Sequence, residues 1–184
     1  MSTVVKSQKF STLFDWFDQD NDGQLTQDDL KATAQVFSRA AAEDDHANIT
    51  AIHDAFEQWW QLLLKHGDSD GDGQVSRQEF ITVMEANVTT PEHFESAVMA
   101  IADAVMNALD TNGDGVLSQD EYVHLYDTLG VPKELSAQAF HRLDLDGDGV
   151  ISFGEYRTAI VEFYLSADPQ AAGNYLLGPA TASL

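Results

Sequence analysis

A twelve-residue acidic pattern occurs four times along the chain, and this repeat constrains the fold more than any other feature of the sequence. Its copies cover residues 18–29, 68–79, 110–121 and 144–155. Each copy has Asp at the first position, Asp or Asn at the third, Asp at the fifth and glycine at the sixth. An aliphatic residue follows at the eighth position and Thr or Ser at the ninth, and the twelfth is Glu except in the first copy. Such internal repetition indicates a fold built from repeated units.

The spacing of the oxygen-bearing side chains suits a hard divalent cation. Side chains at the first, third and fifth positions converge on one point if the chain curls tightly, and glycine permits the positive φ that this curl requires. The seventh residue supplies its backbone carbonyl, the ninth often acts through a water molecule, and the twelfth supplies a bidentate carboxylate. Together these groups match the six to eight oxygen ligands that calcium takes at about 2.3–2.6 Å. The repulsion among the clustered carboxylates is tolerated because a cation is expected at their centre.

This arrangement matches the calcium-binding loop of the EF-hand. Asp-Gly pairs alone are common in turns, but four copies agreeing at so many positions exclude a chance set of acidic turns. The candidate ligands are the residues at the first, third, fifth, seventh and twelfth positions of each copy. They are Asp18, Asp20, Asp22, Gln24 and Asp29; Asp68, Asp70, Asp72, Gln74 and Glu79; Asp110, Asn112, Asp114, Val116 and Glu121; and Asp144, Asp146, Asp148, Val150 and Glu155.

Helical periodicity flanks the loops. Before the first copy, Phe10, Leu13 and Phe14 recur at three- and four-residue steps. Before the third, Thr90 and Pro91 predict the N-cap and first position of a helix. We therefore expect an all-α EF-hand fold, with four helix-loop-helix hands arranged as two packed pairs in a compact molecule. Paired loops should meet in a short antiparallel contact at their eighth positions.

The spacing of the loops predicts two lobes and a tail. Residues 1–88 are expected to form an N-terminal EF-hand pair and residues 89–166 a C-terminal pair. Residues 167–184 form a C-terminal tail that either docks between the lobes or is a frayed terminus. The apolar residues expected to dock are Tyr175, Leu176 and Leu177.

Composition narrows the possible partners. A formal net charge of -22 disfavours nucleic acid and anionic membranes, both of which need basic patches. The absence of cysteine excludes disulfides and thiolate metal sites. No apolar run approaches the roughly 20 residues that span a bilayer, and the first residues lack the apolar core of a secretory signal. No nucleophile motif or phosphate-binding loop suggests an enzyme. We expect a cytoplasmic monomer without catalytic activity and with no evident protein target.

The sequence resembles the sarcoplasmic calcium-binding proteins of invertebrates and the calerythrin-like proteins of actinomycete bacteria. The resemblance rests on four loops, a chain of similar length, an extended gap between the first two hands and a short tail after the fourth. It implies a compact molecule with two packed hand pairs that acts mainly as a calcium buffer. Members of this group often have a degenerate loop, commonly the second, whereas all four are complete here. The number of sites is therefore not carried over from the family.

Three functions are compatible with this pattern. The first is an intracellular calcium buffer or transporter with up to four Ca²⁺ ions. The second is a calcium sensor, which would expose a methionine-rich surface to a protein target. The third is a coelenterazine-binding photoprotein, which needs His, Trp and Tyr around an internal cavity. The candidates for that cavity are His53, Trp59, Trp60, His124, Tyr126 and His141. The intact second loop and the C-terminal Leu184 depart from the photoprotein pattern.

The four loops are not expected to be equivalent. Asp29 is one methylene shorter than Glu, so it reaches an ion with both oxygens less easily. The first site is therefore expected to be six-coordinate and to tolerate Mg²⁺, which requires octahedral geometry. Asn112 removes one ligand charge from the third loop, which should bind calcium more weakly than the fourth.

Overall fold

The computed structural model describes residues 2–176, so Leu177 and the rest of the predicted tail lie outside it. Eight α-helices, four short strands and three short helical segments follow one another along the described chain. The α-helices are α1 Ser2–Phe17, α2 Gln27–Ser38, α3 His46–Gly67, α4 Arg77–Val83, α5 Ala100–Leu109, α6 Gln119–Thr128, α7 Lys133–Leu143 and α8 Phe153–Leu165. The other elements are β1 Gln24–Leu25, β2 Val75–Ser76, β3 Val116–Ser118, β4 Val150–Ser152, the π-helical turns η1 Met84–Val88 and η2 Glu95–Met99, and the 3₁₀ helix η3 Ala172–Tyr175.

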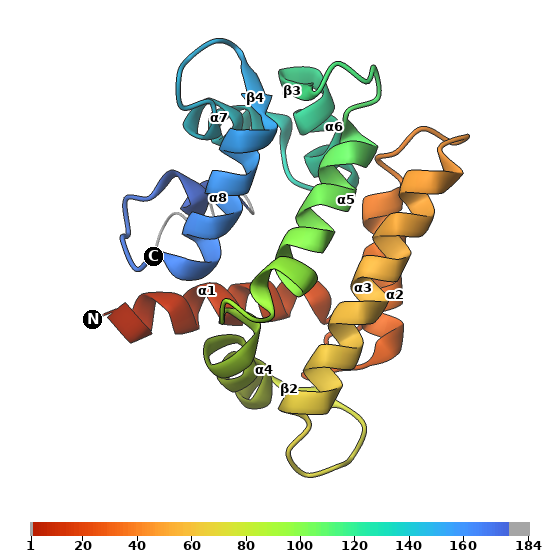
Figure 1. Cartoon of the computed structure of the whole chain (residues 1–184), viewed down its shortest axis with the longest axis vertical. Helices are drawn as coiled ribbons and strands as arrows, with labels where there is room; N and C mark the ends of the chain where they lie inside the picture. Colours follow the sequence, from red (N-terminus) through yellow and green to blue (C-terminus); the bar gives the residue numbers. More distant parts are fainter. Residues whose placement is uncertain (1, 177–184) are drawn as a thin grey trace.

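Each acidic loop lies between two helices, which confirms the predicted all-α EF-hand fold. The first loop joins α1 to α2, the second α3 to α4, the third α5 to α6 and the fourth α7 to α8. These helix-loop-helix units are distributed around the molecule in Figure 1, with the loops at its periphery. No helix among residues 2–176 is long and apolar enough to cross a membrane.

The loops pair through short antiparallel strands, as the spacing predicted. Strand β1 pairs with β2, and Leu25 lies opposite Val75. Strand β3 pairs with β4, and Leu117 lies opposite Ile151. All four eighth-position side chains are fully buried. The apolar face of each loop therefore belongs to the core, while the acidic face is left at the surface.

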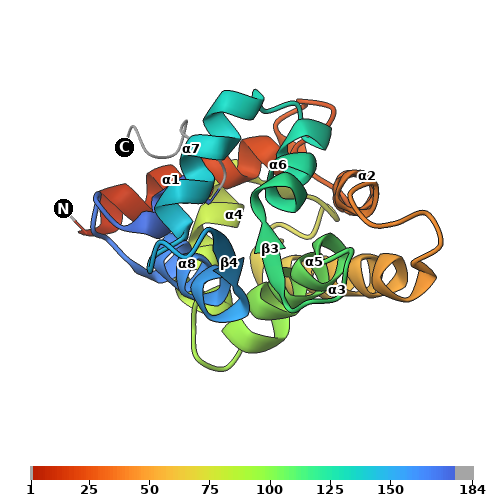
Figure 2. The same ribbon diagram turned by 90° about the horizontal axis from the view of Figure 1, so that it is seen from above.

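The two hand pairs share one hydrophobic core. Helix α3 of the second hand packs along α5 of the third, and α1 packs against both α4 and α8 (Figure 1). Viewed from above, α3 and α5 remain side by side (Figure 2). Aromatic side chains fill the N-terminal part of this core. Phe17 and Trp59, for example, lie edge to face with ring centroids 4.8 Å apart. Such pairs stabilise a core beyond their buried area.

The segment between the second and third hands differs from the sequence prediction. The hydroxyl of Thr90 donates to the carbonyl oxygen of Asn87 at 2.6 Å and does not cap the following helix. Regular α-helix begins only at Ala100, after the π-helical turns η1 and η2 on either side of Thr90. Such turns accommodate an extra residue in a helix, which local propensity does not predict.

A fully buried lysine links the first hand to the last. Lys9 on α1 donates from Nζ to the carbonyl oxygens of Ser166 at 3.0 Å and Glu162 at 3.4 Å. Ser166 is the C-cap residue of α8, and the Glu162 carbonyl also accepts a hydrogen bond from the Ser166 amide at 3.0 Å. The ammonium group also lies 5.7 Å from the centre of the Phe163 ring. Burial lowers the pKa of Lys9 from 10.5 to about 8.

The lowered pKa of Lys9 predicts that this residue makes the stability of the protein depend on pH. Between pH 8 and pH 10 the Lys9 amine is neutral in the folded chain and protonated in the unfolded chain. The unfolded state then binds more protons, so stability rises with pH. The free energy of unfolding of the wild type should rise by about 1 kcal/mol relative to Lys9→Met between pH 7.5 and 9.5. Urea unfolding in saturating calcium measures this difference. The exposed Lys65→Met is the control, and equal pH dependence of wild type and Lys9→Met would contradict the prediction.

Candidate metal centres

Three of the loops bring carboxylates together closely enough to share an ion. The ligand atoms in each cluster lie within 4.8 Å of one another. The clusters are Asp18, Asp20 and Asp22; Asp68, Asp70 and Glu79; and Asp144, Asp146 and Glu155. In the third loop Asn112 supplies an amide oxygen in place of a carboxylate. Oxygen donors alone at such spacing fit calcium, which takes six to eight oxygen ligands.

The turn of each loop depends on two left-handed residues. Gly73, at the sixth position of the second loop, has a φ of +83°. The fourth position is also left-handed, with Gly71 at +76° in the second loop and Asn21 at +59° in the first. Asparagine adopts this conformation more readily than most residues. A positive φ was predicted for the sixth position only, although Asn or Gly at every fourth position is a visible signal.

Backbone amides hold the first carboxylate of each loop in place. In the second loop Asp68 accepts hydrogen bonds from Gly71 N at 2.7 Å and Gly73 N at 3.0 Å. In the third loop Asp110 accepts from the amides of Asp114 at 3.0 Å and Gly115 at 2.9 Å. The amides of the fifth and sixth residues hold the first carboxylate in the first and second loops as well, so the third loop shares these contacts with two loops whose carboxylates cluster.

The fifth and seventh positions are joined in the same way in every loop. The backbone N–H of each seventh residue donates to the side chain of the fifth, at 2.8–3.1 Å. The pairs are Gln24 with Asp22, Gln74 with Asp72, Val116 with Asp114, and Val150 with Asp148. Each seventh residue thus lies where the loop turns into its strand, and its side chain is not needed for this contact.

The closing glutamate spans the loop from its second to its ninth position. Glu79 Oε1 accepts from the amide of Ser69 at 2.9 Å and from its hydroxyl at 2.6 Å. Glu79 Oε2 accepts from the amide of Ser76 at 2.9 Å and its hydroxyl at 2.8 Å. The Ser69 hydroxyl, followed by these other hydrogen bonds, lowers the pKa of Glu79 to about 2. The carboxylate is therefore ionised and oriented before any cation arrives.

The ninth and twelfth positions also start the exit helix. Ser76 and Glu79 form a capping box at the beginning of α4, in which each side chain bonds to the other's backbone amide. The same box begins α2, α6 and α8. The ninth residue was predicted to act through a water molecule, and no role was predicted for Ser69. The Ser-x-x-Glu spacing of a capping box and the hydroxyl at the second position were the signals for these roles.

The electrostatics of the loops favour bound positive charge. Burial disfavours ionisation of Glu121 and Glu155, but hydrogen bonds led by those from Ser118 and Ser152 outweigh it and lower both pKa values. The opposite holds for Asp20. The amide of Asp22 lowers its pKa, but partial desolvation and the surrounding aspartates outweigh this contact and raise it. A divalent cation relieves such repulsion between carboxylates.

The first loop closes with a shorter side chain. Asp29 accepts from the amide of Gln19 at 3.2 Å and from the amide of Thr26 at 2.9 Å, so it spans the same two positions as Glu79. It is only 5% exposed, as is Asp18, and it is absent from the carboxylate cluster of its loop. The shorter reach is thus accommodated by a more buried site.

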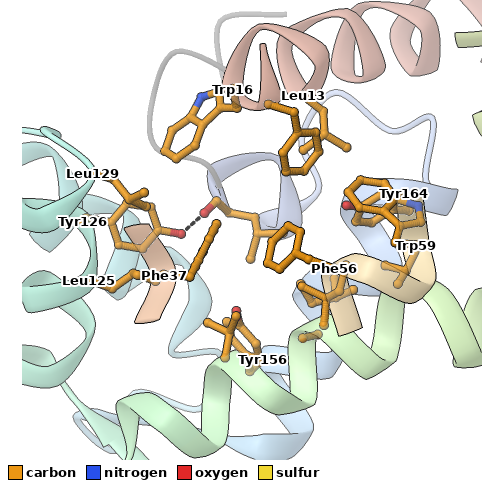
Figure 3. Close-up of a pocket in the computed structure, with 17 residues that line it drawn as sticks. Leu13, Trp16, Phe37, Phe56, Trp59, Leu125, Tyr126, Leu129, Tyr156 and Tyr164 are labelled. Carbon is orange, nitrogen blue, oxygen red and sulfur yellow. Dashed lines mark hydrogen bonds between the residues drawn. The ribbon is translucent and has the colours of Figure 1, made fainter. Parts of the chain in front are cut away.

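The photoprotein candidates are dispersed. Trp59 and Tyr126 line an internal cavity of the core (Figure 3). No histidine is among the described residues that line this cavity, and His124 and His141 are exposed. The histidines that a photoprotein needs around its cavity therefore do not line this one.

Helix-loop-helix units with oxygen-lined loops, paired through two-strand contacts, define the calcium-binding EF-hand class. The sequence profile of the EF-hand domain pair matches residues 8–85 and 99–161. Calerythrin of Saccharopolyspora erythraea is 28% identical over 167 residues, which cover 89% of this chain and 94% of calerythrin. A sarcoplasmic calcium-binding protein of Hediste diversicolor is 30% identical over 130 residues, which cover 70% of this chain and 72% of that protein. The structure of a Streptomyces coelicolor calcium-binding protein has a TM-score of 0.70 and 28% identity, covering 88% of this chain and 98% of that one.

The chain therefore belongs to the EF-hand family, in the group of calerythrin and the sarcoplasmic calcium-binding proteins. This confirms the family resemblance inferred from the four loops, and calcium binding follows from it.

The contacts of Glu79 predict the effect of a single hydroxyl. Ser69→Ala removes one hydrogen bond to this carboxylate, so its pKa should rise from about 2 and protons should displace calcium at higher pH. The calcium affinity of the second loop should fall roughly three- to tenfold. Titrations that follow the amide resonance of Gly73 measure this site separately. Thr82→Ala, which removes a hydroxyl of the same hand that donates only to the Gln78 carbonyl, is the control. Equal affinities of Ser69→Ala and wild type would show that the hydroxyl has no role.

Proposed function

We propose that the protein is an intracellular calcium buffer that binds four calcium ions without exposing a surface to a protein target. The proposed ligands are the residues at the first, third, fifth, seventh and twelfth loop positions named in the sequence analysis. The two backbone hydrogen bonds that hold Asp110 support a fourth site in the third loop, although Asn112 reduces the charge of this loop. The proposal also includes a cytoplasmic location, a monomeric state and the absence of catalytic activity.

The burial of the methionines supports a calcium buffer rather than a calcium sensor. Sensor hands expose a methionine-rich groove when calcium binds. Here Met84, Met99 and Met106 are at most 1% exposed and belong to the shared core. The exposed large apolar side chains among the described residues are Leu145, Val161 and Leu165, which do not form a methionine-rich groove. A core closed in this way suits a protein that binds calcium without recruiting a partner.

The first site is proposed to accept magnesium. Mg²⁺ requires near-ideal octahedral geometry, whereas Ca²⁺ accepts a bidentate carboxylate and higher coordination numbers. The short side chain of Asp29 and the buried Asp18 favour the smaller ion, because fewer oxygens reach the centre of the loop.

Calcium titration of the metal-free chain tests the proposal. Calorimetry should show four ions bound per chain, and the melting temperature should rise strongly because calcium binds the folded state. The fluorescence of a hydrophobic dye should not increase on calcium addition, because the core remains closed. Glu121→Gln should remove the third site and leave the other three. A large calcium-dependent increase in dye fluorescence would favour a sensor. Three ions on the wild-type chain and still three on Glu121→Gln would exclude a functional third loop.

Asp29→Glu tests the magnesium preference of the first site. The longer side chain should increase the calcium affinity of this loop relative to its magnesium affinity, because both carboxylate oxygens then reach the ion. Glu155→Asp is the reciprocal variant in the fourth loop and should shift that site toward magnesium. Calorimetry in calcium with and without magnesium measures both. An unchanged ratio of affinities in Asp29→Glu would refute the assignment.

A further inference from the structure

Two histidine rings lie beside one another outside the calcium loops. The centroids of the His66 and His93 rings are 5.5 Å apart, and the ring planes are inclined by 50°. His66 is the next-to-last residue of α3, and His93 lies in the connection between the second and third hands, shortly before η2. The side chain of His66 is exposed and that of His93 is half-buried. The pair therefore joins the second hand to the connection that leads to the third.

The spacing of the two rings fits one shared metal ion. A zinc ion lies about 2.0–2.1 Å from each imidazole nitrogen that binds it and prefers tetrahedral angles. Because each ring centroid lies about 1 Å beyond its nitrogen, two rings bound in this way have centroids about 5 Å apart. The observed 5.5 Å is close to this value. Rings in a core also pair at such spacing, but the exposed His66 gains little from ring packing alone.

The surroundings of His93 leave one of its ring nitrogens free to bind a metal. The Thr90 hydroxyl lies 3.4 Å from His93 Nδ1. The single proton of this hydroxyl is donated to the Asn87 carbonyl, so the hydroxyl oxygen can only accept from Nδ1–H. A neutral imidazole with its proton on Nδ1 has a lone pair on Nε2. Metal-binding histidines are commonly oriented by a hydrogen bond from the nitrogen that does not bind the metal.

Both histidines are carried by backbone that is anchored in the core. Gly67, which follows His66, is buried, and a Cβ there would lie 3.2 Å from Val83 Cγ1. The end of α3 therefore approaches α4 closely. Phe94, which follows His93, is buried, and η2 packs against α3. Because the two backbones are held in place, an ion that binds both rings orders little more than the rings themselves.

The donors and the charge of the chain select the class of metal. Imidazole nitrogen suits zinc and its neighbours nickel and copper, whereas calcium and magnesium prefer oxygen. The net charge of -22 attracts cations, and the carboxyl end of α3 adds partial negative charge near His66. Among residues 2–176, no third imidazole or carboxylate joins the pair in a cluster of ligand atoms within 4.8 Å. Two protein ligands leave the remaining coordination positions to water.

We propose that His66 and His93 bind one zinc ion at a site separate from the calcium loops. Nε2 of His93 and one ring nitrogen of His66 are the protein ligands. Thr90 is a positioning residue that leaves Nε2 of His93 unprotonated. The bound ion links the end of α3 to the connection between the two hand pairs. This site does not depend on whether the protein acts as a calcium buffer or as a sensor.

Zinc binding is tested on the full chain in millimolar calcium, which fills the loops and keeps zinc from their carboxylates. Calorimetry with zinc chloride should detect one ion per chain with a micromolar dissociation constant. The ring resonances of His66 and His93 should shift with zinc, whereas those of the exposed His124 on α6 should not. The absence of saturable zinc binding below millimolar concentration would overturn the proposal.

Single-histidine variants locate the site. His66→Ala and His93→Ala should each weaken zinc binding at least tenfold, because the remaining imidazole holds the ion alone. His124→Ala removes an exposed histidine elsewhere and should bind zinc like the wild type. Melting temperatures in calcium show whether each variant is folded. Should His93→Ala not fold, His93→Gln keeps a polar side chain there and should weaken binding in the same direction. Wild-type zinc affinity in a folded variant of either histidine would overturn the proposal.

Thr90→Val tests the positioning hydroxyl. Without this acceptor, the zinc-free His93 ring should shift toward the tautomer protonated on Nε2, and zinc affinity should fall about tenfold. Nitrogen NMR of the imidazole measures the tautomer directly. Thr89→Val is the matched control, because the neighbouring hydroxyl donates to the Met84 carbonyl and should affect neither quantity. An unchanged tautomer and an unchanged affinity in Thr90→Val would overturn the role of this residue.

Discussion

The carboxylate at the twelfth position of each loop is the interaction on which the rest of the hand depends. It accepts hydrogen bonds from the second position of the loop and from the residue that caps the exit helix. One side chain thus connects the cation site, the loop backbone and the start of a helix. Because Tyr156 directly follows Glu155 and lines the central cavity, this connection extends into the shared core.

The acidic surface and the apolar core are arranged by the same loops. Carboxylates gather on the outer face of each loop, where repulsion between them is relieved by a divalent cation. The aliphatic eighth residue points the other way and pairs with its counterpart in the neighbouring loop. The four acidic loops are consequently connected in pairs through strands of two or three residues, and the two pairs are connected to one another through the packing of α3 on α5.

Much of each loop's geometry could be predicted because the loop consists of twelve consecutive residues. The turn, the converging carboxylates and the antiparallel contact depend on local geometry, so spacing alone indicates them. The sequence-based prediction was wrong where one local pattern is compatible with two structures. Thr90 precedes Pro91 as an N-cap residue would, yet its hydroxyl bonds back to Asn87 because the connection between the lobes is wound into π-helical turns. Ser69 has no role in the bare ligand pattern, and only the folded loop places it against Glu79.

The sequence by itself determined the four loops, their glycine turns, the helices that flank them and the family to which the chain belongs. Only the tertiary structure decided that Lys9 binds the end of α8, that Gly173 brings the C-terminal segment onto the same helix, and that aromatic side chains from both hand pairs enclose a cavity. Ligand spacing is a property of consecutive residues and is visible in the sequence. The cavity depends on how side chains distant in sequence fit together, which no local pattern encodes.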